Sequence, residues 1–351
     1  MYKLICLVLL LLPLAQAQDT FERRAMLENL TQNVILLAHA ELVEAVEGLE
    51  QAAQTFVADP SALTLDVAQA AWGEVGTAWA GVELYALGPL DITVLHNQIN
   101  KPIITPTLID EYLESGEVNA ETLAAQGSTV KGITAAEYLL LSPDGDEAVL
   151  AAFEETQRTD YLIALSEVLR KSAQDLYTYW SPEGENYAAT FSAADEAGGS
   201  TKGSINMLVN EMIVVLEEVA RMKLAAPLGL SDGEVADPSK VEAPLSETSL
   251  RRIRANLKSV EQAFTGGDGL GLDDYLEFLG AEVQATLVEQ RLAEALNALD
   301  AIEEPLETAV TTQPDTVQAL YDAVQALLVA TSVDAANQLG ITVTFSDADG
   351  D

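Results

Sequence analysis

Apolar residues recur at three- and four-residue spacings along most of this chain, and this period constrains the fold more than any other feature of the sequence. Between residues 27 and 56 the recurring positions are Leu36, Leu37, Ala40, Val43, Val46, Leu49 and Ala53. Such spacing places one apolar stripe along an amphipathic helix. Strand-like alternation is nearly absent, and the one candidate is residues 341–345 near the end of the chain. The sequence therefore predicts an all-α fold.

Proline and glycine mark where the predicted helices end. The Asp59-Pro60 pair separates the first helix from a second one, which ends at Gly88-Pro89. Residues 90–130 are less regular and include an extended-looking segment, residues 102–106. Further helices are predicted over residues 146–180, 203–224, 249–264, 272–279, 281–308 and 314–339.

The glycine-containing stretch of residues 194–201 is the clearest break in the chain. It divides the mature protein into two helical halves that resemble four-helix bundles, residues 18–195 and residues 196–351. The order of helix, Asp59-Pro60 and helix near the start is similar to the order of helix, Gln313-Pro314 and helix near the end. This similarity fits internal duplication, and it fits chance similarity among helices rich in alanine and leucine equally well.

Residues 1–17 are predicted to be a secretory signal peptide. Lys3 supplies the positive start, an apolar stretch follows, and Ala15-Gln16-Ala17 is a small-x-small cleavage site. The apolar run is too short to span a bilayer in the mature protein, although an uncleaved membrane anchor is the alternative. The only cysteine, Cys6, lies inside this segment. A mature chain that starts near Gln18 therefore has no thiol, no disulfide and no cysteine ligand for a metal.

The chain carries a formal net charge of -39, and such a surface repels nucleic acid and acidic lipid headgroups. Nucleic-acid binding and membrane-surface binding are therefore excluded as main activities. The charge either attracts cations, including metal ions, or keeps the protein soluble outside the cytoplasm. With 49% hydrophobic and 21% charged residues, the chain does not have the composition of a disordered acidic protein.

Residues 131–140 contain Gly132, Thr134 and Glu137, followed by Tyr-Leu-Leu. This pattern resembles the GxHxxE signature of the imelysin family, the M75 peptidase-like proteins that include insulin-cleaving membrane proteases and relatives of iron-regulated protein A. In that family the histidine and the glutamate lie three residues apart, on one helix face, as two ligands of one cation must. Here Thr134 stands at the histidine position.

Three further segments are similar to segments of the imelysin family and occur in the same order. They are residues 71–91, residues 241–257 and residues 339–351. The family often carries an arginine near the position of Gly76, and this chain has none between residues 72 and 83. Together, the four segments extend over most of the mature chain.

The resemblance implies a cleft between the two halves and a role in iron or metal acquisition or in peptidase-like chemistry. It also implies metal-binding residues: Glu137, which matches the motif glutamate, and Glu83, which matches the family's glutamate before the Gly-Pro pair. His96 is a third candidate, because it follows that pair in a less regular segment, where binding sites often form. The expected cation is divalent or iron, and the sequence leaves its identity open.

Each candidate also has a structural interpretation. Thr134 and Glu137 fit a capping box, in which each side chain accepts a hydrogen bond from the other residue's backbone amide. Glu83 fits the surface of a packed helix, and His96 fits a solvent-facing loop. His39 lies on or beside a buried stripe, where we expect a structural, hydrogen-bonded histidine.

Other residues are assigned structural roles. Ser246 and Ser249 are expected to cap the helix that begins near residue 250. Residues 347–351 resemble the opening of a calcium loop, but the later ligands of such a loop are missing. The aromatic residues Trp72, Trp79, Tyr85 and Trp180 are expected to lie in the core.

Three functions follow from these observations. The leading one is a non-enzymatic protein of the periplasm or outer envelope that binds a small ligand, a metal ion or a metal complex, with a protein partner in the envelope also compatible. The second is an M75-type metallopeptidase, and the third is a structural or adaptor protein. The mature sequence contains no His-Glu-x-x-His pattern, no nucleophile elbow and no thiol. It therefore favours a protein without enzymatic activity.

Overall fold

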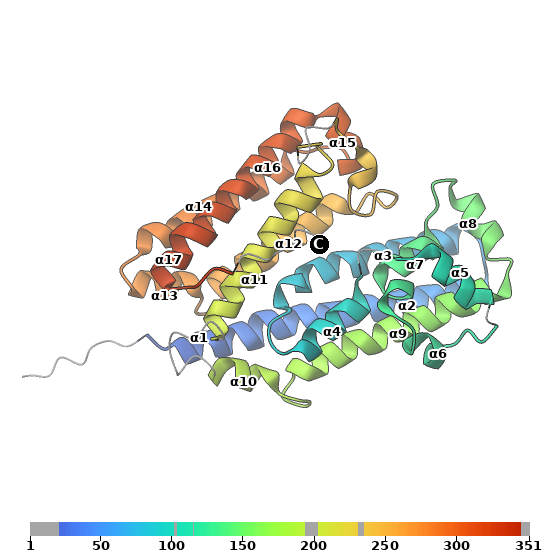
Figure 1. Cartoon of the computed structure of the whole chain (residues 1–351), viewed down its shortest axis with the longest axis horizontal. Helices are drawn as coiled ribbons and strands as arrows, with labels where there is room; N and C mark the ends of the chain where they lie inside the picture. Colours follow the sequence, from blue (N-terminus) through green and yellow to red (C-terminus); the bar gives the residue numbers. More distant parts are fainter. Residues whose placement is uncertain (1–20, 102–103, 115, 194–202, 231–234, 345–351) are drawn as a thin grey trace, which may run out of the picture.

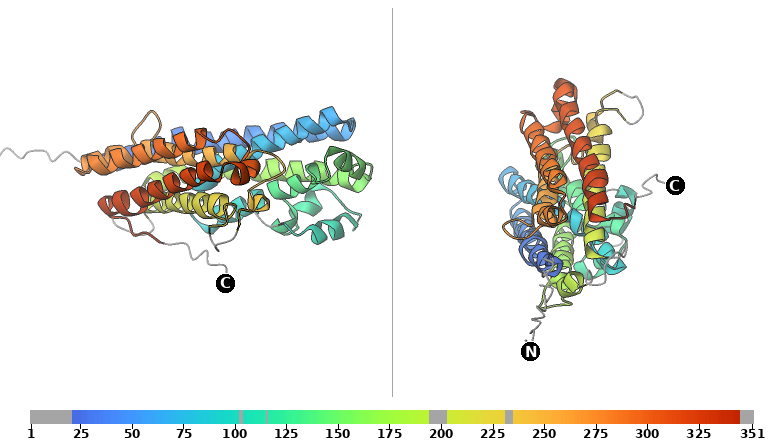
Figure 2. Two further views of the ribbon diagram at one scale, coloured as in Figure 1. Left: turned by 90° about the horizontal axis from the view of Figure 1, so that it is seen from above. Right: turned by 90° about the vertical axis from the view of Figure 1, so that its left-hand side faces the viewer.

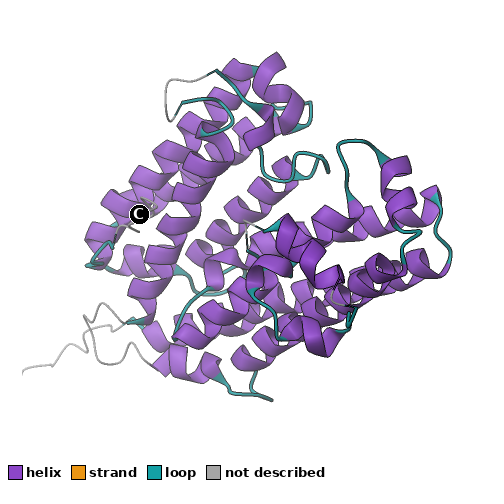
Figure 3. Cartoon of the chain, turned by 45° about the vertical axis from the view of Figure 1, so that its right-hand side comes forward, coloured by secondary structure: helices purple, strands orange, loops and turns teal. Residues whose placement is uncertain are grey.

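The structure, a computed structural model, describes residues 21–101, 104–114, 116–193, 203–230 and 235–344. These residues form helices joined by loops and contain no strand (Figures 1 and 3). The prediction of an all-α fold is confirmed. The predicted signal peptide, the break at residues 194–201 and the acidic end at residues 347–351 lie outside the described residues. None of the described helices is both long and apolar enough to cross a membrane.

The N-terminal helices begin with one long rod and a second helix that runs back along it. The rod consists of α1 (Arg23–Leu30), the π-helical turn η1 (Thr31–Ile35) and α2 (Leu36–Ala58). Asp59 leaves the helical conformation and ends the rod, and Ser61 then starts α3 (Ala62–Val82) through a capping box with Thr64. The predicted helix pair around Asp59-Pro60 is therefore present.

The remaining N-terminal elements pack around this pair (Figure 1). The longest, α9 (Thr156–Trp180), lies along α2. The shorter elements are η2 (Glu83–Tyr85), α4 (Leu90–Ile99), α5 (Pro106–Glu114), α6 (Ala120–Ala124), η3 (Ser128–Val130), α7 (Ile133–Leu140), α8 (Asp146–Ala152) and α10 (Tyr187–Ala193).

Two stretches of this half differ from the prediction. Residues 90–130, expected to be irregular, contain three helices, because Pro89 and Asn119 occupy N-cap positions and Pro106 is the first residue of α5. The single helix predicted over residues 146–180 is broken between α8 and α9. Phe153 follows α8 and packs its ring edge-on against Phe56, with the centroids 4.8 Å apart. That contact is tertiary, so the local period does not encode the break.

The C-terminal helices pack mainly against one another. Their bounds are α11 (Ser204–Glu218), η5 (Val219–Ala225), η6 (Pro238–Lys240), α12 (Ser249–Thr265), α13 (Leu272–Phe278), α14 (Glu282–Asp300), α15 (Leu306–Thr312), α16 (Pro314–Val329), η7 (Ala330–Ala335) and α17 (Ala336–Leu339). α14 and α16 lie side by side, and α11 packs on α16 (Figure 2). The single helix predicted over residues 281–308 is wrong, because it ends at Asp300 and a new helix starts after Pro305.

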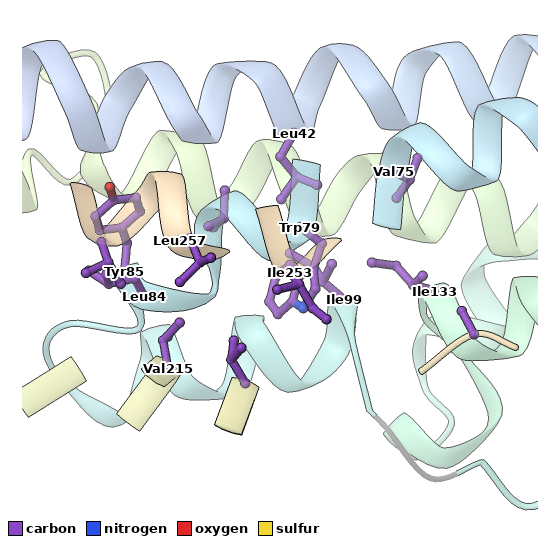
Figure 4. Close-up of a cluster of buried hydrophobic side chains, with 14 of the residues drawn as sticks. Leu42, Val75, Trp79, Leu84, Tyr85, Ile99, Ile133, Val215, Ile253 and Leu257 are labelled. Carbon is purple, nitrogen blue, oxygen red and sulfur yellow. The ribbon is translucent and has the colours of Figure 1, made fainter. Parts of the chain in front are cut away.

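One helix, α12, connects the two sets of helices. It packs against α3 on the N-terminal side and against α11 and α14 on the C-terminal side. The hydrophobic core is therefore continuous from one set to the other (Figure 4). The residues labelled there are Leu42, Val75, Trp79, Leu84, Tyr85, Ile99, Ile133, Val215, Ile253 and Leu257, all of them buried. The division into domains at residue 195 stays a prediction, and the core crosses it.

The predicted strand near the end of the chain is not formed. Residues 341–344 are extended but have no partner strand among the described residues. The Asn210 side chain of α11 takes the partner's place, accepting a hydrogen bond from the Thr344 amide over 2.7 Å and donating to the Thr342 oxygen over 3.2 Å. The alternating pattern thus reflects an extended segment that packs on a helix.

Candidate functional site

Three helices meet at Gly132, in the motif segment. Gly132 has a φ of 94°, and a Cβ atom there would lie 2.6 Å from the backbone oxygen of Ile99, the last residue of α4. Only glycine allows this approach, so α7 begins at Ile133 directly beside the end of α4. Trp72 of α3 ties the third helix to the same point by donating its indole N–H to the Ile133 oxygen over 2.9 Å.

Thr134, at the position of the motif histidine, lies in the first turn of α7. It is half-buried, and its hydroxyl donates to the side-chain oxygen of Asn100 over 3.2 Å. The N-cap of α7 is Gly132, and no side-chain capping bond is formed. The predicted capping box of Thr134 and Glu137 is therefore wrong, because the tight contact at Gly132 starts the helix earlier and places Thr134 inside it.

Arg252 of α12 lies against α3 close to the motif. Its guanidinium stacks over the Trp72 ring, 4.8 Å from the centroid, and fills the space beside Gly76, where any side chain would clash with it. Nε donates to Thr248 Oγ1 over 3.2 Å, and Nη1 donates to Glu242 Oε1 over 3.3 Å. Nη2 is buried and has no hydrogen-bond partner within the described part of the chain. One charged donor of the site therefore lacks an acceptor.

Ser246 and Ser249 shape the loop before α12 and do not cap the helix. The N-cap is Thr248, and no side-chain capping bond is formed there. Ser249 Oγ lies within hydrogen-bonding distance of the Glu242 backbone oxygen and of Glu307 Oε1. The predicted capping role is wrong, because these hydroxyls hold the loop that carries Glu242 toward Arg252.

Lys223, on the π-helical turn η5, is the centre of a buried charge cluster. Its side chain is only 4% exposed, and its Nζ lies 3.3 Å from Glu83 Oε2 and 3.1 Å from Glu242 Oε2. Nζ donates hydrogen bonds to Glu83 Oε2 and, over 2.8 Å, to Asn256 Oδ1, and it forms an ion pair with Glu242. Burial works against the charge, but Glu83, Glu242 and Glu218 together raise the pKa of Lys223 above its ordinary value.

Glu83 is held in this cluster from two helices. Asn256 of α12 donates from Nδ2 to Glu83 Oε2 over 2.7 Å and to the Ala80 backbone oxygen over 2.8 Å. The same carboxylate oxygen faces the Lys223 ammonium. Glu83 therefore links α3 to α12 and η5, and its charge is compensated inside the protein.

Two further glutamates add negative charge to the site. Burial raises the pKa of Glu137 to about 7, and there the attraction of Arg252 is opposed by the repulsion of Glu242. Burial and the neighbouring Glu83 raise the pKa of Glu218 to about 7 as well. With pKa values near 7, both carboxyls would release protons to a cation that approached them.

His96 and His39 are both buried on helices. The expected solvent-facing loop at His96 is wrong, because the residue lies on α4 and is 7% exposed. Its ring packs edge-on against Trp79 with the centroids 5.0 Å apart, and burial, aided by His39, lowers the pKa of His96 to about 3. His39 is fully buried with Nδ1 2.7 Å from the Ile35 oxygen, which confirms its predicted structural role. The four aromatic residues expected in the core are also buried, as predicted.

The three predicted metal ligands do not converge into a complete ligand set. Over the described residues, no group of three or more His, Cys, Asp or Glu side chains is placed to hold a metal ion. Glu83 is engaged by Lys223, and the His96 ring packs against Trp79. Glu137 is the candidate whose carboxylate has no compensating partner within hydrogen-bonding distance in the described part of the chain. A metal held here would need donors beyond these side chains.

Sequence reasoning missed the basic half of the site. Arg252 and Lys223 were not among the predicted site residues, because the spacing of charges along one helix does not show which cations are buried. Glu242 and Asn256 did carry a signal, since both stand in the family-like segment of residues 241–257. For Lys223 the only signal was its place in the apolar stretch of residues 219–225.

Comparisons with known proteins agree with this architecture. A sequence profile of the family described as Imelysin (Peptidase_M75) matches residues 35–333. Iron-regulated protein A of Synechococcus elongatus is 26% identical over 292 residues, which cover 80% of this chain and 76% of that protein. The crystal structure of an imelysin-like protein from Psychrobacter arcticum superposes with a TM-score of 0.76 and 21% identity, covering 92% of this chain and 97% of that chain. The crystal structure of a candidate iron-regulated protein A precursor from Parabacteroides distasonis superposes with a TM-score of 0.74 and 18% identity, covering 93% of this chain and 97% of that chain.

Proposed function

Because the chain belongs to the imelysin family, we propose that it is an exported binding protein with an iron-related role and no peptidase activity. The proposed site surrounds Arg252 and Glu137, where α12 packs against α3 and η5 and α7 packs against α3. Its ligand is a metal complex whose cation faces Glu137 and whose oxygen donors face Arg252. The relative in Synechococcus elongatus is described as iron-regulated, and one structural neighbour is described as a precursor, which supports the iron-related role and the export.

The observation that carries this proposal is the pairing of two unsatisfied groups. Arg252 Nη2 is a buried charged donor without an acceptor among the described residues, and a buried donor of this kind is costly unless something accepts its hydrogen bond. Glu137 is a half-buried carboxyl with a pKa of about 7. A cation near Glu137 would displace its proton, and an anionic oxygen bound to that cation would accept from Arg252.

The surroundings favour a complex over a bare ion. The described side chains do not provide three ligands for a metal, so the remaining coordination positions would be filled by the ligand's own oxygens. A cavity of about 250 Å³ lies on the same side of α12 as Arg251, and its lining includes Gly73, Thr248 and Arg251. Thr248 accepts a hydrogen bond from Arg252, so one lining residue of this cavity contacts the guanidinium.

Calorimetric titration of the mature protein tests the proposal. The probes are ferric citrate, citrate alone and Zn²⁺ alone, because these separate the complex from its two components. We expect ferric citrate to bind and both Glu137→Gln and Arg252→Lys to weaken it by about tenfold or more. The matched controls are Glu154→Gln, an exposed carboxylate, and Arg254→Lys, an exposed arginine on the same helix that pairs with Asp300.

Repeating the titration in buffers of different ionisation enthalpy measures proton release. We expect about one proton to be released near pH 7 in wild type and fewer in Glu137→Gln. If Zn²⁺ alone binds and Arg252→Lys leaves its affinity unchanged, the ligand is a simple metal ion and not a metal complex. Binding of no probe would favour the structural or adaptor role, and chelator-sensitive cleavage of a protein that Glu137→Gln abolishes would establish the peptidase.

A further inference from the structure

A groove of about 730 Å³ runs along three adjacent helices, on faces that the charge cluster does not use. α3 lies in the middle of this row, because it packs against both α2 and α12. The floor of the groove is made of small residues of α3, including Ala78 and Gly81. Its walls carry Leu37, Glu41 and Lys258. The site residue Arg252 belongs to the same helix as Lys258 but is not among the lining residues.

Gly81 has no internal reason to be glycine. Glycine is among the least favourable residues inside a helix, so a helical glycine usually reflects a close neighbour. For Gly73 and Gly76 on the same helix that neighbour is an arginine side chain packed against the backbone. A Cβ at Gly81 would meet no atom within 4 Å in the described part of the chain. The space above Gly81 is thus open, and a close neighbour there would have to come from another molecule.

The charge along the groove is unbalanced. Glu74 pairs with Arg251 over 2.6 Å, and Lys258 pairs with Glu261 over 2.6 Å. On the α2 wall, Glu41 and Glu44 are exposed and form no ion pair with the described residues. Leu37 lies beside them with 55% of its surface exposed. The α2 wall therefore offers an apolar contact and two free carboxylates.

We propose that this groove binds a basic amphipathic helix of a partner protein. The lining residues of η1 and α2 extend from Asn33 to Ala45, which corresponds to about 18 Å, or three helical turns. A helix with small apolar residues on one face fits over Gly81, and lysine or arginine residues at its edge fit against Glu41 and Glu44. A second copy of this chain is a poor occupant, because each copy carries a net charge of -39.

A designed peptide tests this proposal on the mature protein. The probe is a fluorescent peptide of about 14 residues with alanine and leucine on one helical face and lysine on the other, compared with a version in which glutamate replaces lysine. We expect the lysine peptide to bind at about 0.15 M salt and Gly81→Leu to weaken it by about tenfold or more. The matched control is Gly48→Leu, because Gly48 is also a helical glycine with open space around it but does not line the groove.

A second pair of variants tests the electrostatic part of the proposal, the attraction between the α2 carboxylates and the lysines of the peptide. The double substitution Glu41→Gln and Glu44→Gln should weaken the binding of the lysine peptide severalfold. The control, Glu154→Gln with Glu303→Gln, removes the same charge from exposed positions elsewhere and should leave the binding unchanged. The proposal is overturned if the lysine peptide does not bind, if the glutamate peptide binds as tightly, or if Gly48→Leu and Gly81→Leu act alike. A dimer of wild type in sedimentation that Gly81→Leu abolishes would assign the groove to a second copy and would also overturn it.

Discussion

Replacing Lys223 with methionine tests whether the buried charge cluster holds the two sets of helices together. Methionine keeps most of the length of the side chain and removes the ammonium that contacts Glu83, Glu242 and Asn256. At contact distances near 3 Å and an effective dielectric constant of about 20, each attraction to a carboxylate is about 5 kcal/mol before desolvation. Loss of one partner from a buried ion pair costs about 3–5 kcal/mol net, because the other charge stays buried.

Stability is best measured by urea unfolding followed by circular dichroism at pH 8 and at pH 5. We expect Lys223→Met to lose about 3–5 kcal/mol at pH 8, a large part of the 5–15 kcal/mol that is typical of a folded protein. The loss should shrink at pH 5, because Lys223 is one of the two cations that hold the pKa of Glu242 low, and without it protonation of Glu242 relieves the repulsion between the two carboxylates. Lys171→Met is the control, since Lys171 is 70% exposed and its pair with Asp175 should contribute less than about 1 kcal/mol.

The double variant Lys223→Met and Glu83→Gln separates charge from packing. It should regain about 1–2 kcal/mol at pH 8 relative to Lys223→Met, because one uncompensated carboxylate is removed. A loss in Lys223→Met as small as that in Lys171→Met would refute the reasoning. A loss of stability that is the same at pH 8 and pH 5 would also refute the reasoning, because it would mean that water solvates the carboxylates.

Three further predictions concern the motif segment and the end of the chain. Burial raises the pKa of Glu137 to about 7, so the residue favours folding while its carboxyl is protonated, and this contribution is lost as the pH rises toward and through 7. At pH 8, Glu137→Gln should therefore be more stable than wild type by at most about 3 kcal/mol in urea unfolding. At pH 4 the two proteins should differ little. Gly132→Ala should cost more than about 2 kcal/mol in the same assay, because its φ is 94° and its Cβ would lie 2.6 Å from the Ile99 oxygen. Asn210→Ala should increase the hydrogen exchange rate of the Thr344 amide, and an unchanged rate would show that this hydrogen bond does not hold the segment.

The sequence predicted the helices well because their signal is local. An apolar residue at every third or fourth position specifies a helix with one buried face, whatever that face packs against. The rod over α1 and α2, the turn at Asp59-Pro60 and the helix α12 follow from that period and from local breakers. The motif segment of residues 131–140 and the profile match over residues 35–333 also agree, because a family is recognised by residues close in sequence.

Two errors at the candidate site lie where distant residues override local preference. His96 was expected in a loop, but α4 forms and buries it against Trp79. The capping box at Thr134 was plausible from spacing alone, and it fails because Ile99 approaches Gly132 closely enough to start α7 earlier. Both of these errors concern a contact between separate helices, which a single helical period does not describe, whereas the break before Pro305 was a local signal that the prediction over residues 281–308 overlooked.

The composition of the charge cluster was decided by the tertiary structure alone. Lys223 and Glu83 are separated by 140 residues and Asn256 and Glu83 by 173, yet their side chains form hydrogen bonds. The carboxylates around Lys223 then raise its pKa against the effect of burial, and both burial and these distances are properties of the whole packing rather than of any segment. The sequence by itself therefore determined an all-α chain of the imelysin family with an unusual Thr134. Only the packing of α3, α7, α12 and η5 decided which charges meet, since charges interact through space and their distances are set by how the helices pack.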